Sequence, residues 1–437
     1  MPHIPLIVGL GLALCQGALA QNPPVASQDA PLRLTFEEAM ERARANSPQI
    51  LSANLAALMA REDTAQAKAA LLPNVSSFNQ FIYTQPNGTP TGAFVSNDGV
   101  HVYNNQAIVH GDILDLSKRA DYRKMQLAEA VARARAEIAA RGLVATVTEN
   151  YYGMVSAMRR HANAEQSQRE AGQFLDITRK QERGGEVAHS DAVKAEIQFV
   201  GRQRDTQEAQ LGLDKARIGL AVLLFPDFRQ DFTVVDDLDT PRPLPVFREI
   251  QALAGEKSPD IRAALATVEQ QKWEIKSSRA ALLPSLSADY FFGLNANQFA
   301  INNPEGYRNL ASVFQAQLNI PIWTWGAARS RVKQSEMRLE QAKNDLSLTY
   351  RQLLANLNSF YLEAVTANSQ IGSLRHSLEL SAESLKLTLL RYEAGEVSVL
   401  EVVDAQTTLA EARNEYDDGM VRYRVALANL QTLTGAF

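Results

Sequence analysis

Few side chains in this sequence have the types and spacing that catalysis requires. Beyond His3 the histidines stand apart, without an HExxH pair or another metal-ligand spacing; they are His101, His110, His161, His189 and His376. The chain also lacks a phosphate-binding Walker loop, a GxGxxG dinucleotide loop and a GxSxG nucleophile turn. The sequence therefore predicts a protein that is not an enzyme and that has no cofactor and no metal site.

Two carboxylates near the C-terminus are placed where they could act together. Glu401 and Asp404 are three residues apart, so on a helix they would lie on one face. They follow closely after Gly395, a residue type suited to end a preceding helix. Such a pair could attract cations. Acidic residues are also common on solvated helix faces, and the residues alone favour that second interpretation.

The first twenty residues have the pattern of a secretory signal peptide. An apolar stretch over 4–14 is followed by an Ala-Leu-Ala triplet at 18–20, the small-x-small pattern of signal peptidase, and we expect cleavage before Gln21. The sole cysteine, Cys15, follows Leu14, where a lipoprotein signal would have a small residue, so a lipid anchor is the minor alternative. The mature chain would then have no disulfide and no thiolate metal site.

The composition argues against nucleic acid as a partner. A formal charge of −5 and a pI near 5.8 give no basic field that would attract phosphate backbones. The 437 residues are 46% hydrophobic, and no linker rich in Gly, Ser or Pro separates two halves. The sequence therefore fits a single elongated architecture as well as it fits several separate domains. After the signal, no window reaches the roughly 18 consecutive apolar residues that a membrane-spanning helix needs. If the chain crosses a membrane, we expect it to do so as a β-barrel.

The chain repeats itself after about half its length. The segment ALLPNVS around Pro73 returns as ALLPSLS around Pro284 (284 − 73 = 211), and NSPQI around Pro48 returns as KSPDI around Pro259 at the same offset. Further on, the Gly-Glu-Val at 185–187 returns at 395–397. Matching segments in one order indicate a tandem duplication. We divide the mature chain into a first repeat over 21–225, an inter-repeat segment over 226–245 and a second repeat over 246–437.

Each repeat has the pattern of a helix, a β-hairpin, a long helix and a return helix. Thr35 and Glu38 have capping-box spacing, and a Ser-Pro step at 47–48 and at 258–259 restarts a helix. Apolar residues then alternate with polar ones, which indicates strands. The expected elements are hairpins over 74–113 and 285–320, long helices over 116–183 and 326–393, and return helices over 190–224 and 398–434. The inter-repeat segment, rich in Pro and Asp, reads as a small patch of strand and loop.

The two long helices contain no proline, and at 1.5 Å per residue each would be about 100 Å long. Apolar residues along the second recur with a period near 3.5, which indicates left-handed supercoiling against neighbouring helices. Four strands are too few for a barrel, which takes about eight, so a membrane barrel would require an oligomer. A soluble periplasmic coiled-coil scaffold capped by the hairpins is the alternative. An isolated hairpin is marginal in water, and this favours the barrel.

The order of three segments resembles the outer-membrane efflux protein family, the TolC-like outer-membrane factors. The segments are LTFEEAMERARANSPQI, AKAALLPNVS and RYEAGEVSVLEVVDAQTTLAEARNEY. The resemblance covers essentially the whole mature chain. It implies a mainly α protein with a β-barrel: a homotrimer whose twelve strands form one barrel in the outer-membrane lipid and whose twelve helices form a tunnel across the periplasm of a Gram-negative cell.

The resemblance also implies a function and partners. Such proteins are passive exit ducts that dock an inner-membrane transporter and a periplasmic adaptor (membrane fusion) protein. We expect this chain to conduct drugs or other toxic small molecules to the exterior, with the exit duct of a type I protein secretion system as the alternative. The cargo, and whether Cys15 is lipidated, stay open at this point.

Several residues take roles from this resemblance. Glu401 and Asp404 match acidic positions that line the closed periplasmic end of the tunnel, so a trimer would carry two rings of carboxylates there. Tyr392 and Asp191 match positions of a polar latch between neighbouring helices, although Val397 stands where that network has an Arg. The glycines at the helix tips, Gly184, Gly185 and Gly395, would dock the adaptor. The acid pair makes the second repeat the better candidate for the gate.

Four aromatic residues fit an interfacial belt at the membrane surface; they are Tyr290, Tyr307, Trp323 and Trp325. For the two tryptophans, packing at the junction between barrel and long helix is an equally good interpretation.

Overall fold

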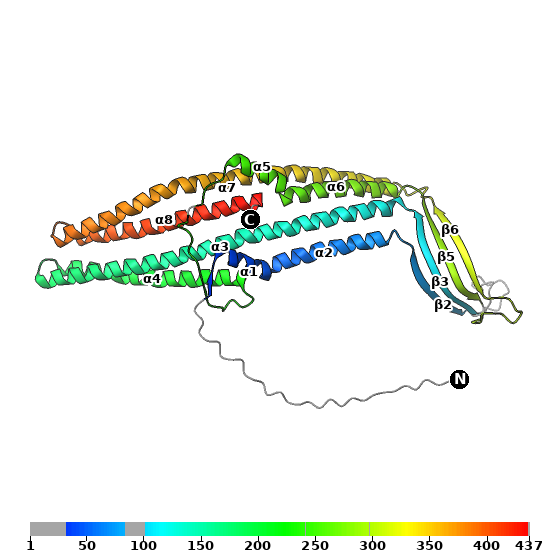
Figure 1. The fold of residues 1–437 in the computed structure, drawn as a ribbon, viewed down its shortest axis with the longest axis horizontal. Coiled ribbons are helices and arrows are strands. Elements are labelled where there is room, and N and C mark those ends of the chain that lie inside the picture. The colour runs from blue at the N-terminus through cyan, green and yellow to red at the C-terminus, as the bar shows by residue number, and fades with distance from the viewer. Residues whose placement is uncertain (1–31, 84–100, 241, 297, 436–437) are drawn as a thin grey trace, which may run out of the picture.

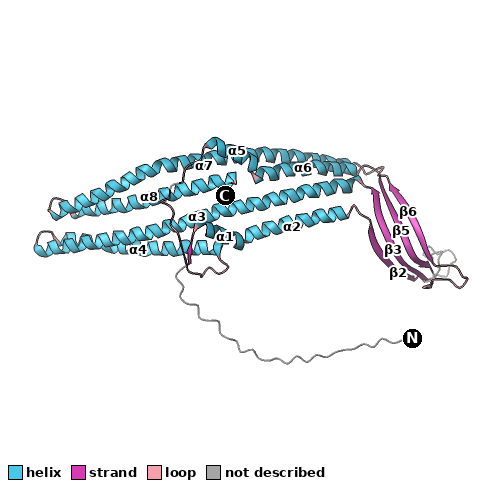
Figure 2. Ribbon diagram, viewed as in Figure 1, coloured by secondary structure: helices cyan, strands magenta, loops and turns pink. Residues whose placement is uncertain are grey.

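The computed structural model describes residues 32–83, 101–240, 242–296 and 298–435. The molecule is a long rod with a β-sheet at one end and two helix tips at the other (Figure 1). Helices make up the whole length between the tips and the sheet (Figure 2). The expected signal peptide, Cys15 and the connection inside the first hairpin lie outside the described residues.

The same order of elements occurs twice along the chain. The first series is α1 (Phe36–Asn46), α2 (Pro48–Ala69), β2 (Asn74–Tyr83), β3 (His101–Leu114), α3 (Leu116–Gly184) and α4 (His189–Leu224). The second is α5 (Phe247–Lys257), α6 (Pro259–Ala280), β5 (Ser285–Ala296), β6 (Leu310–Asn319), α7 (Ala327–Glu393) and α8 (Val399–Thr434). Helices and hairpins therefore lie within a residue or two of the expected ranges.

The helix starts follow the capping signals in the sequence. The Thr35 hydroxyl accepts a hydrogen bond from the Glu38 amide, and the Glu38 carboxylate accepts one from the Thr35 amide. These two bonds form the predicted capping box. Ser47 and Ser258 cap the helices that begin at Pro48 and Pro259. Because proline lacks an N–H, it fits the first helical position, where no partner for that group exists.

The two long helices end at glycines that adopt positive φ. Gly185 closes α3 with φ 77°, and Gly395 follows α7 with φ 74°. The space beside each is open, so a side chain there would be strained by the backbone and not by neighbours. Gly184, expected to share the turn, is instead the last residue of α3. One left-handed residue is enough to reverse the chain.

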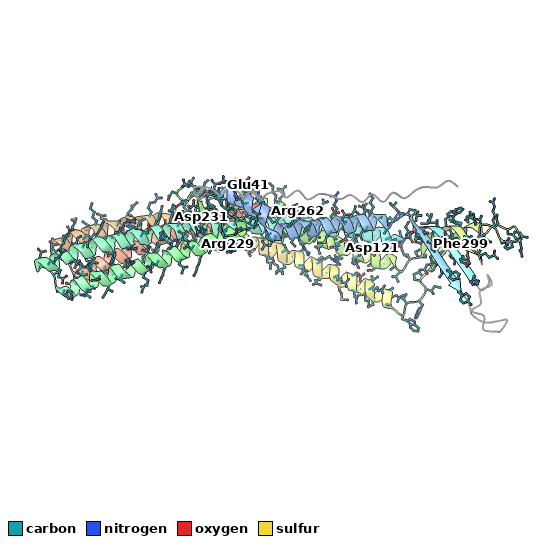
Figure 3. All side chains as sticks on the ribbon, turned by 90° about the horizontal axis from the view of Figure 1, so that it is seen from below. Glu41, Asp121, Arg229, Asp231, Arg262 and Phe299 are labelled. Atoms are coloured by element: carbon teal, nitrogen blue, oxygen red, sulfur yellow. The ribbon has the colours of Figure 1, made fainter. Side chains whose placement is uncertain are left out.

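The helices form a layer whose order changes halfway along the rod. Near the sheet, neighbouring helices follow the order α2, α3, α6, α7; near the tips the order is α4, α3, α8, α7 (Figure 1). The helices α3 and α7 run the full length, while pairs of half-length helices complete the layer. Figure 3 shows side chains along the whole rod, with Asp121 towards the sheet end and Asp231 near the middle. In the part of the chain that the structure describes, no helix is both long and apolar enough to cross a membrane.

The inter-repeat segment forms a small sheet that the sequence predicted only in part. Its strand β4 (Phe232–Val234) pairs in parallel with β1 (Leu32–Leu34), a strand that was not expected. Both pack on α3, where Tyr151 donates to the Leu34 and Val235 carbonyls at 3.1 and 2.7 Å. Burial and the nearby Asp237 raise the pKa of Tyr152, the next residue, to about 12. This patch fixes the middle of the rod.

Candidate functional site

The tip of α8 carries the acid pair that the sequence singled out. Glu401 and Asp404 are both exposed, whereas Val402 and Ala405 beside them are buried. The Glu401 carboxylate accepts from the Ser398 amide at 3.3 Å, which closes a capping box at the start of α8. Within the described residues, Asp404 has no ion-pair partner. The pair thus shares one exposed face, as expected, but Glu401 also has a structural task.

The two residues expected to form a latch have different partners in this structure. Tyr392 on α7 is 3% exposed and donates to Thr178 Oγ1 on α3 at 3.2 Å. Asp191 on α4 pairs instead with Lys194, at 3.2 Å. Burial raises the pKa of Tyr392; its bond to Thr178 partly offsets this, and the Asp191 charge adds to the rise. Asp191 therefore acts on Tyr392 through its charge, and Thr178 is a partner that the sequence did not reveal.

An apolar cluster joins the two helical hairpins at the tips. Its residues come from α3, α4, α7 and α8; they are Phe174, Leu175, Ala195, Leu385, Tyr392, Val399, Val402, Ala405 and Leu409. The rings of Phe174 and Tyr392 meet edge to face at 5.0 Å between centroids. Val397, which stands where the family network has an Arg, packs partly buried against this cluster. In this chain, apolar packing occupies the place where a polar network was expected.

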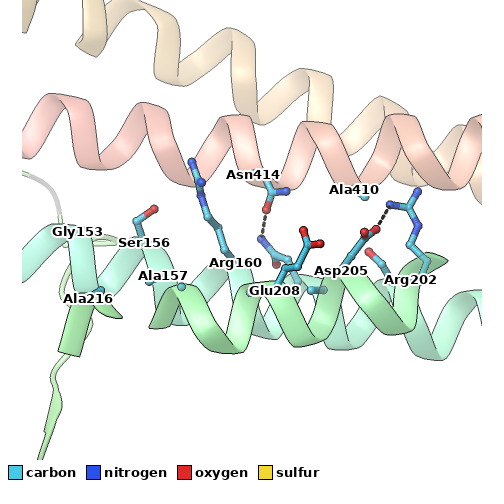
Figure 4. A pocket seen from close by; sticks show the side chains of 15 residues that line it. Gly153, Ser156, Ala157, Arg160, Arg202, Asp205, Glu208, Ala216, Ala410 and Asn414 are labelled. Atoms are coloured by element: carbon cyan, nitrogen blue, oxygen red, sulfur yellow. Dashed lines mark hydrogen bonds and ion pairs between the residues drawn. The ribbon is translucent and has the colours of Figure 1, made fainter. Parts of the chain in front are cut away.

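Polar contacts also join the two helical hairpins, at the end of the apolar cluster that lies further from the tips. Arg413 on α8 makes a two-pronged ion pair with Glu170 on α3, at 2.8 and 3.1 Å. Arg202 on α4 donates to Thr407 on α8 at 2.9 Å. Beside them, α3, α4 and α8 line a groove of about 560 Å³ (Figure 4). Its walls carry side chains of both charge signs, among them Arg160, Asp205 and Glu208.

The inter-repeat segment is held at the middle of the rod by two arginines. Arg159 on α3 bonds to Asp236, Asp239 and Asp417, with Asp239 at 2.8 Å and Asp417 at 2.9 Å. Burial lowers the pKa of Arg159, but the bonds to Asp236 and Asp417 outweigh this effect and raise it above the usual value. Arg424 on α8, 4% exposed, donates to the Asp237 and Leu238 carbonyls at 2.7 and 3.3 Å. These contacts join α3 and α8 through the segment between the repeats.

The four longer strands form one antiparallel sheet in the order β2-β3-β5-β6. Cross-strand pairs share a face, since side chains alternate along each strand. One face is largely apolar; its exposed residues include Val75, Phe81, Tyr83, Tyr290, Phe292, Phe314 and Leu318, and the half-buried Val109 lies among them. The opposite face carries most of the polar residues, among them Ser76, Gln80, Asn104, Gln106, Ser287, Gln315, Gln317 and Asn319, and it also carries the apolar Phe78, Ile108, Phe291 and Val313. Within the described residues, β2 and β6 each leave one edge unpaired.

Two tryptophans stand exposed between the sheet and α7. Trp323 and Trp325 meet edge to face at 5.7 Å, and Trp325 is 88% exposed with φ 51°. Tyr307, in the connection between β5 and β6, is exposed as well. Both tryptophans therefore project from the junction of the isolated chain and are not packed within it.

Among the residues that the structure describes, no group of three or more His, Cys, Asp or Glu side chains is arranged to hold a metal ion.

Comparison with known proteins agrees with this geometry. The chain is 24% identical over 412 residues to the outer membrane protein TolC of Vibrio cholerae, covering 91% of this chain and 90% of that protein. It is 22% identical over 402 residues to the alkaline protease secretion protein AprF of Pseudomonas aeruginosa, covering 89% and 82%. The fold matches the Campylobacter jejuni CmeC outer membrane channel with a TM-score of 0.80 at 16% identity, over 92% of this chain and 85% of that one.

The family profile described as "Outer membrane efflux protein" matches twice, at residues 39–224 and again at 251–436. Each match covers one of the two series of elements, from the first helix of the series to its return helix. The chain therefore belongs to the outer membrane efflux protein family.

Proposed function

We propose that this protein is the outer-membrane exit duct of an efflux system, built from three copies of the chain. Its family consists of channels of Gram-negative bacteria, so the protein lies in the outer membrane and extends into the periplasm. The observation that carries the proposal is the amphipathic sheet with two open edges at one end of a helical rod.

The apolar face of the sheet supports a position in lipid. Phe314 is 69% exposed, and its cross-strand partner Tyr290 is also exposed. Apolar surface in water costs about 25 cal/mol per Å², so a face of this kind needs a cover. Lipid outside and water inside match the alternation of apolar and polar residues in membrane β-barrels. The polar face would then line a water-filled lumen.

The open edges support a ring of copies joined head to tail. On one edge lie β2, α2 and α4, and on the other lie β6 and α7. Exposed apolar residues follow both edges; they include Leu51, Leu55, Leu58, Ile197, Val200 and Leu211 on one, and Leu348, Leu362, Leu380, Leu387 and Leu390 on the other. Two different edges produce a heterologous contact, which gives a ring when the rotation between neighbouring copies closes. Three copies, the number implied by the resemblance, supply twelve strands (3 × 4).

The same ring would make the helical layers into a tunnel through the periplasm. Its narrow end would lie at the helix tips, where Glu401 and Asp404 present carboxylates to the passage and act as the gate. Tyr392 and Thr178, with Asp191 nearby, would hold the tips of the two hairpins together. The turns at Gly184, Gly185 and Gly395 would meet the periplasmic adaptor, which connects the duct to an inner-membrane transporter.

Efflux of drugs or toxic small molecules is the cargo that we propose, in keeping with the family description. Protein secretion is the second candidate. It is favoured by one observation, the similarity to a protease secretion protein along 89% of this chain. A passive duct receives its cargo from the transporter, so a deletion strain distinguishes the two candidates. Greater susceptibility to drugs supports efflux, whereas the loss of secreted proteins supports secretion.

Cell fractionation tests the proposal. We expect the protein in the outer-membrane fraction, running as a trimer on a gel until it is heated, and forming ion-conducting channels in planar bilayers. Recovery of a soluble periplasmic monomer that does not conduct would contradict it.

A further inference from the structure

Charged side chains are rare in the four strands of the large sheet. Among all their residues, the strands hold two histidines on β3, one aspartate on β3 and one on β5; they are His101, His110, Asp112 and Asp289. His110, Asp112 and Asp289 share the polar face, at the end of the sheet next to the helices, while His101 lies on the apolar face at the far end. Three of the four are thus gathered in one place.

His110 lies between the two aspartates. Its cross-strand partner on β5 is Asp289, with 2.7 Å from His110 Nδ1 to Asp289 Oδ1. On its other side, 3.8 Å separates His110 Nε2 from Asp112 Oδ2. Asp112 is also bonded to the Lys118 ammonium at the start of α3. All four side chains remain partly accessible to water.

The charge of this group depends on one proton. The cross-strand neighbours are uncharged: on β2 the partner of His110 is Asn74, and on β6 the partner of Asp289 is Gln315. Asp115, whose carboxylate accepts from the amides that begin α3, adds a fixed negative charge that does not change with the proton on His110. His110, Asp112, Asp289 and Lys118 form one charged group. The positive charge of Lys118 offsets the negative charge of Asp112, so the group has a net charge of −1, from Asp289, when the His110 imidazole is neutral. When His110 is protonated, its positive charge offsets that of Asp289 and the group is neutral. Histidine is the side chain that changes charge between about pH 5 and pH 8.

We propose that His110 and Asp289 form a proton-controlled cation-selectivity site at the junction of barrel and tunnel. This rests on the proposed function, in which the polar face lines the lumen. Three copies then place three such groups at one level, with a total charge of −3 when His110 is neutral and 0 when it is protonated. Carboxylates that face a water-filled passage attract cations, so the site favours monovalent cations and cationic solutes, and it loses that preference in acid.

The site is separate from the acid pair at the tips. The sheet and the α7–α8 turn lie at opposite ends of the rod (Figure 1). The double variant Glu401→Gln, Asp404→Asn therefore removes the tip charges without touching the sheet, and glutamine can keep the capping contact of Glu401. It provides a background in which the contribution of His110 and Asp289 can be measured alone.

Reversal potentials in a KCl gradient across planar bilayers test the proposal. In the tip-variant background, we expect the ratio of potassium to chloride permeability to lie above unity at about pH 8 and to fall toward unity at about pH 5. His110→Asn keeps the charge of Asp289, so its ratio should stay at the alkaline value at both pH values. Asp289→Asn should lower the ratio at alkaline pH and lower it further in acid, because the protonated His110 then has no carboxylate across the strand to balance its charge. His101→Asn, on the other face, is the matched control and should behave like the parent.

Two results would overturn the inference while leaving the duct intact. One is a conducting His110→Asn channel that keeps the full pH dependence of the parent; the other is unchanged selectivity in both sheet variants. Each variant is first shown to run as a heat-modifiable trimer, which separates these results from misfolding. A parent protein that neither enters the membrane nor conducts would instead refute the proposed function itself.

Discussion

Tyr392 makes two separable contributions at the helix tips: its hydroxyl bonds Thr178, and its ring packs on Phe174. Tyr392→Phe removes only the first, and we expect a loss of about 1 kcal/mol in stability. Tyr392→Ala also leaves a cavity, for which we expect about 3–5 kcal/mol. Thermal unfolding of the trimer in detergent measures both.

Thr178→Val supplies the matched control for the hydroxyl. Both changes remove the Tyr392–Thr178 hydrogen bond, so combining them should cost less than the sum of the two single losses. What the second change adds is the loss of the bond that the Thr178 hydroxyl donates to the Phe174 carbonyl at 3.0 Å. Equal losses for Tyr392→Phe and Tyr392→Ala would show that the ring contributes nothing, contrary to the packing described above.

Glu401, one of the two residues that we propose for the gate, also stabilises the start of α8. Because Glu401 closes a capping box, its replacement by alanine mixes lost charge with a lost cap. Glu401→Gln with Asp404→Asn removes the charges, and glutamine retains the capping contact. We expect higher single-channel conductance with unchanged thermal stability. Glu411→Gln, an exposed acid further along α8, should leave conductance as it is. If the Glu401→Gln, Asp404→Asn variant forms an intact trimer with unaltered conductance, these two acids do not act as the gate.

The strands offer the sharpest contrast between two faces of one element. Phe314 and Gln315 are adjacent and both exposed, yet they point to opposite sides of β6. Phe314→Arg would place a charge in lipid, at a cost of about 2–4 kcal/mol near the bilayer centre, so we expect less protein in the outer membrane. Gln315→Arg would face water and should assemble normally. Quantitative fractionation measures both variants. Normal assembly of Phe314→Arg together with loss of Gln315→Arg from the outer membrane would show that the polar face, and not the apolar face, lies against lipid.

The long helices, their caps and the hairpins were predictable because each has a local signal. Thr35, Ser47 and the proline after it mark helix starts, and apolar alternation marks strands over a few residues. Strand β1 was missed because three residues carry no period, and its partner β4 lies in the distant inter-repeat segment. Thr178 was missed for a related reason: a helical seam predicts a buried face but not which helix covers it. The acid pair was found because its spacing is local.

In the proposed ring, two different edges of the chain meet. Ile197 on α4 and Leu387 on α7 represent these edges, and each is more than half exposed. Ile197→Arg should block one edge and Leu387→Arg the other, so each variant alone should be a monomer. Mixed in equal amounts, they should form heterodimers, because one intact edge of each kind remains. Light scattering or native mass spectrometry distinguishes these states. Homodimers of either single variant would indicate a symmetric contact instead.

In the proposed duct, the polar face of the sheet lines a passage that continues between the helices to the tips. Electron cryo-microscopy of the purified protein in lipid nanodiscs tests this most directly. We expect a threefold ring with twelve strands in the lipid disc, the side chains of His110 and Gln315 facing the interior and those of Phe314 and Tyr290 facing lipid. A single copy with an open sheet, or a ring with the polar face turned towards lipid, would contradict the account.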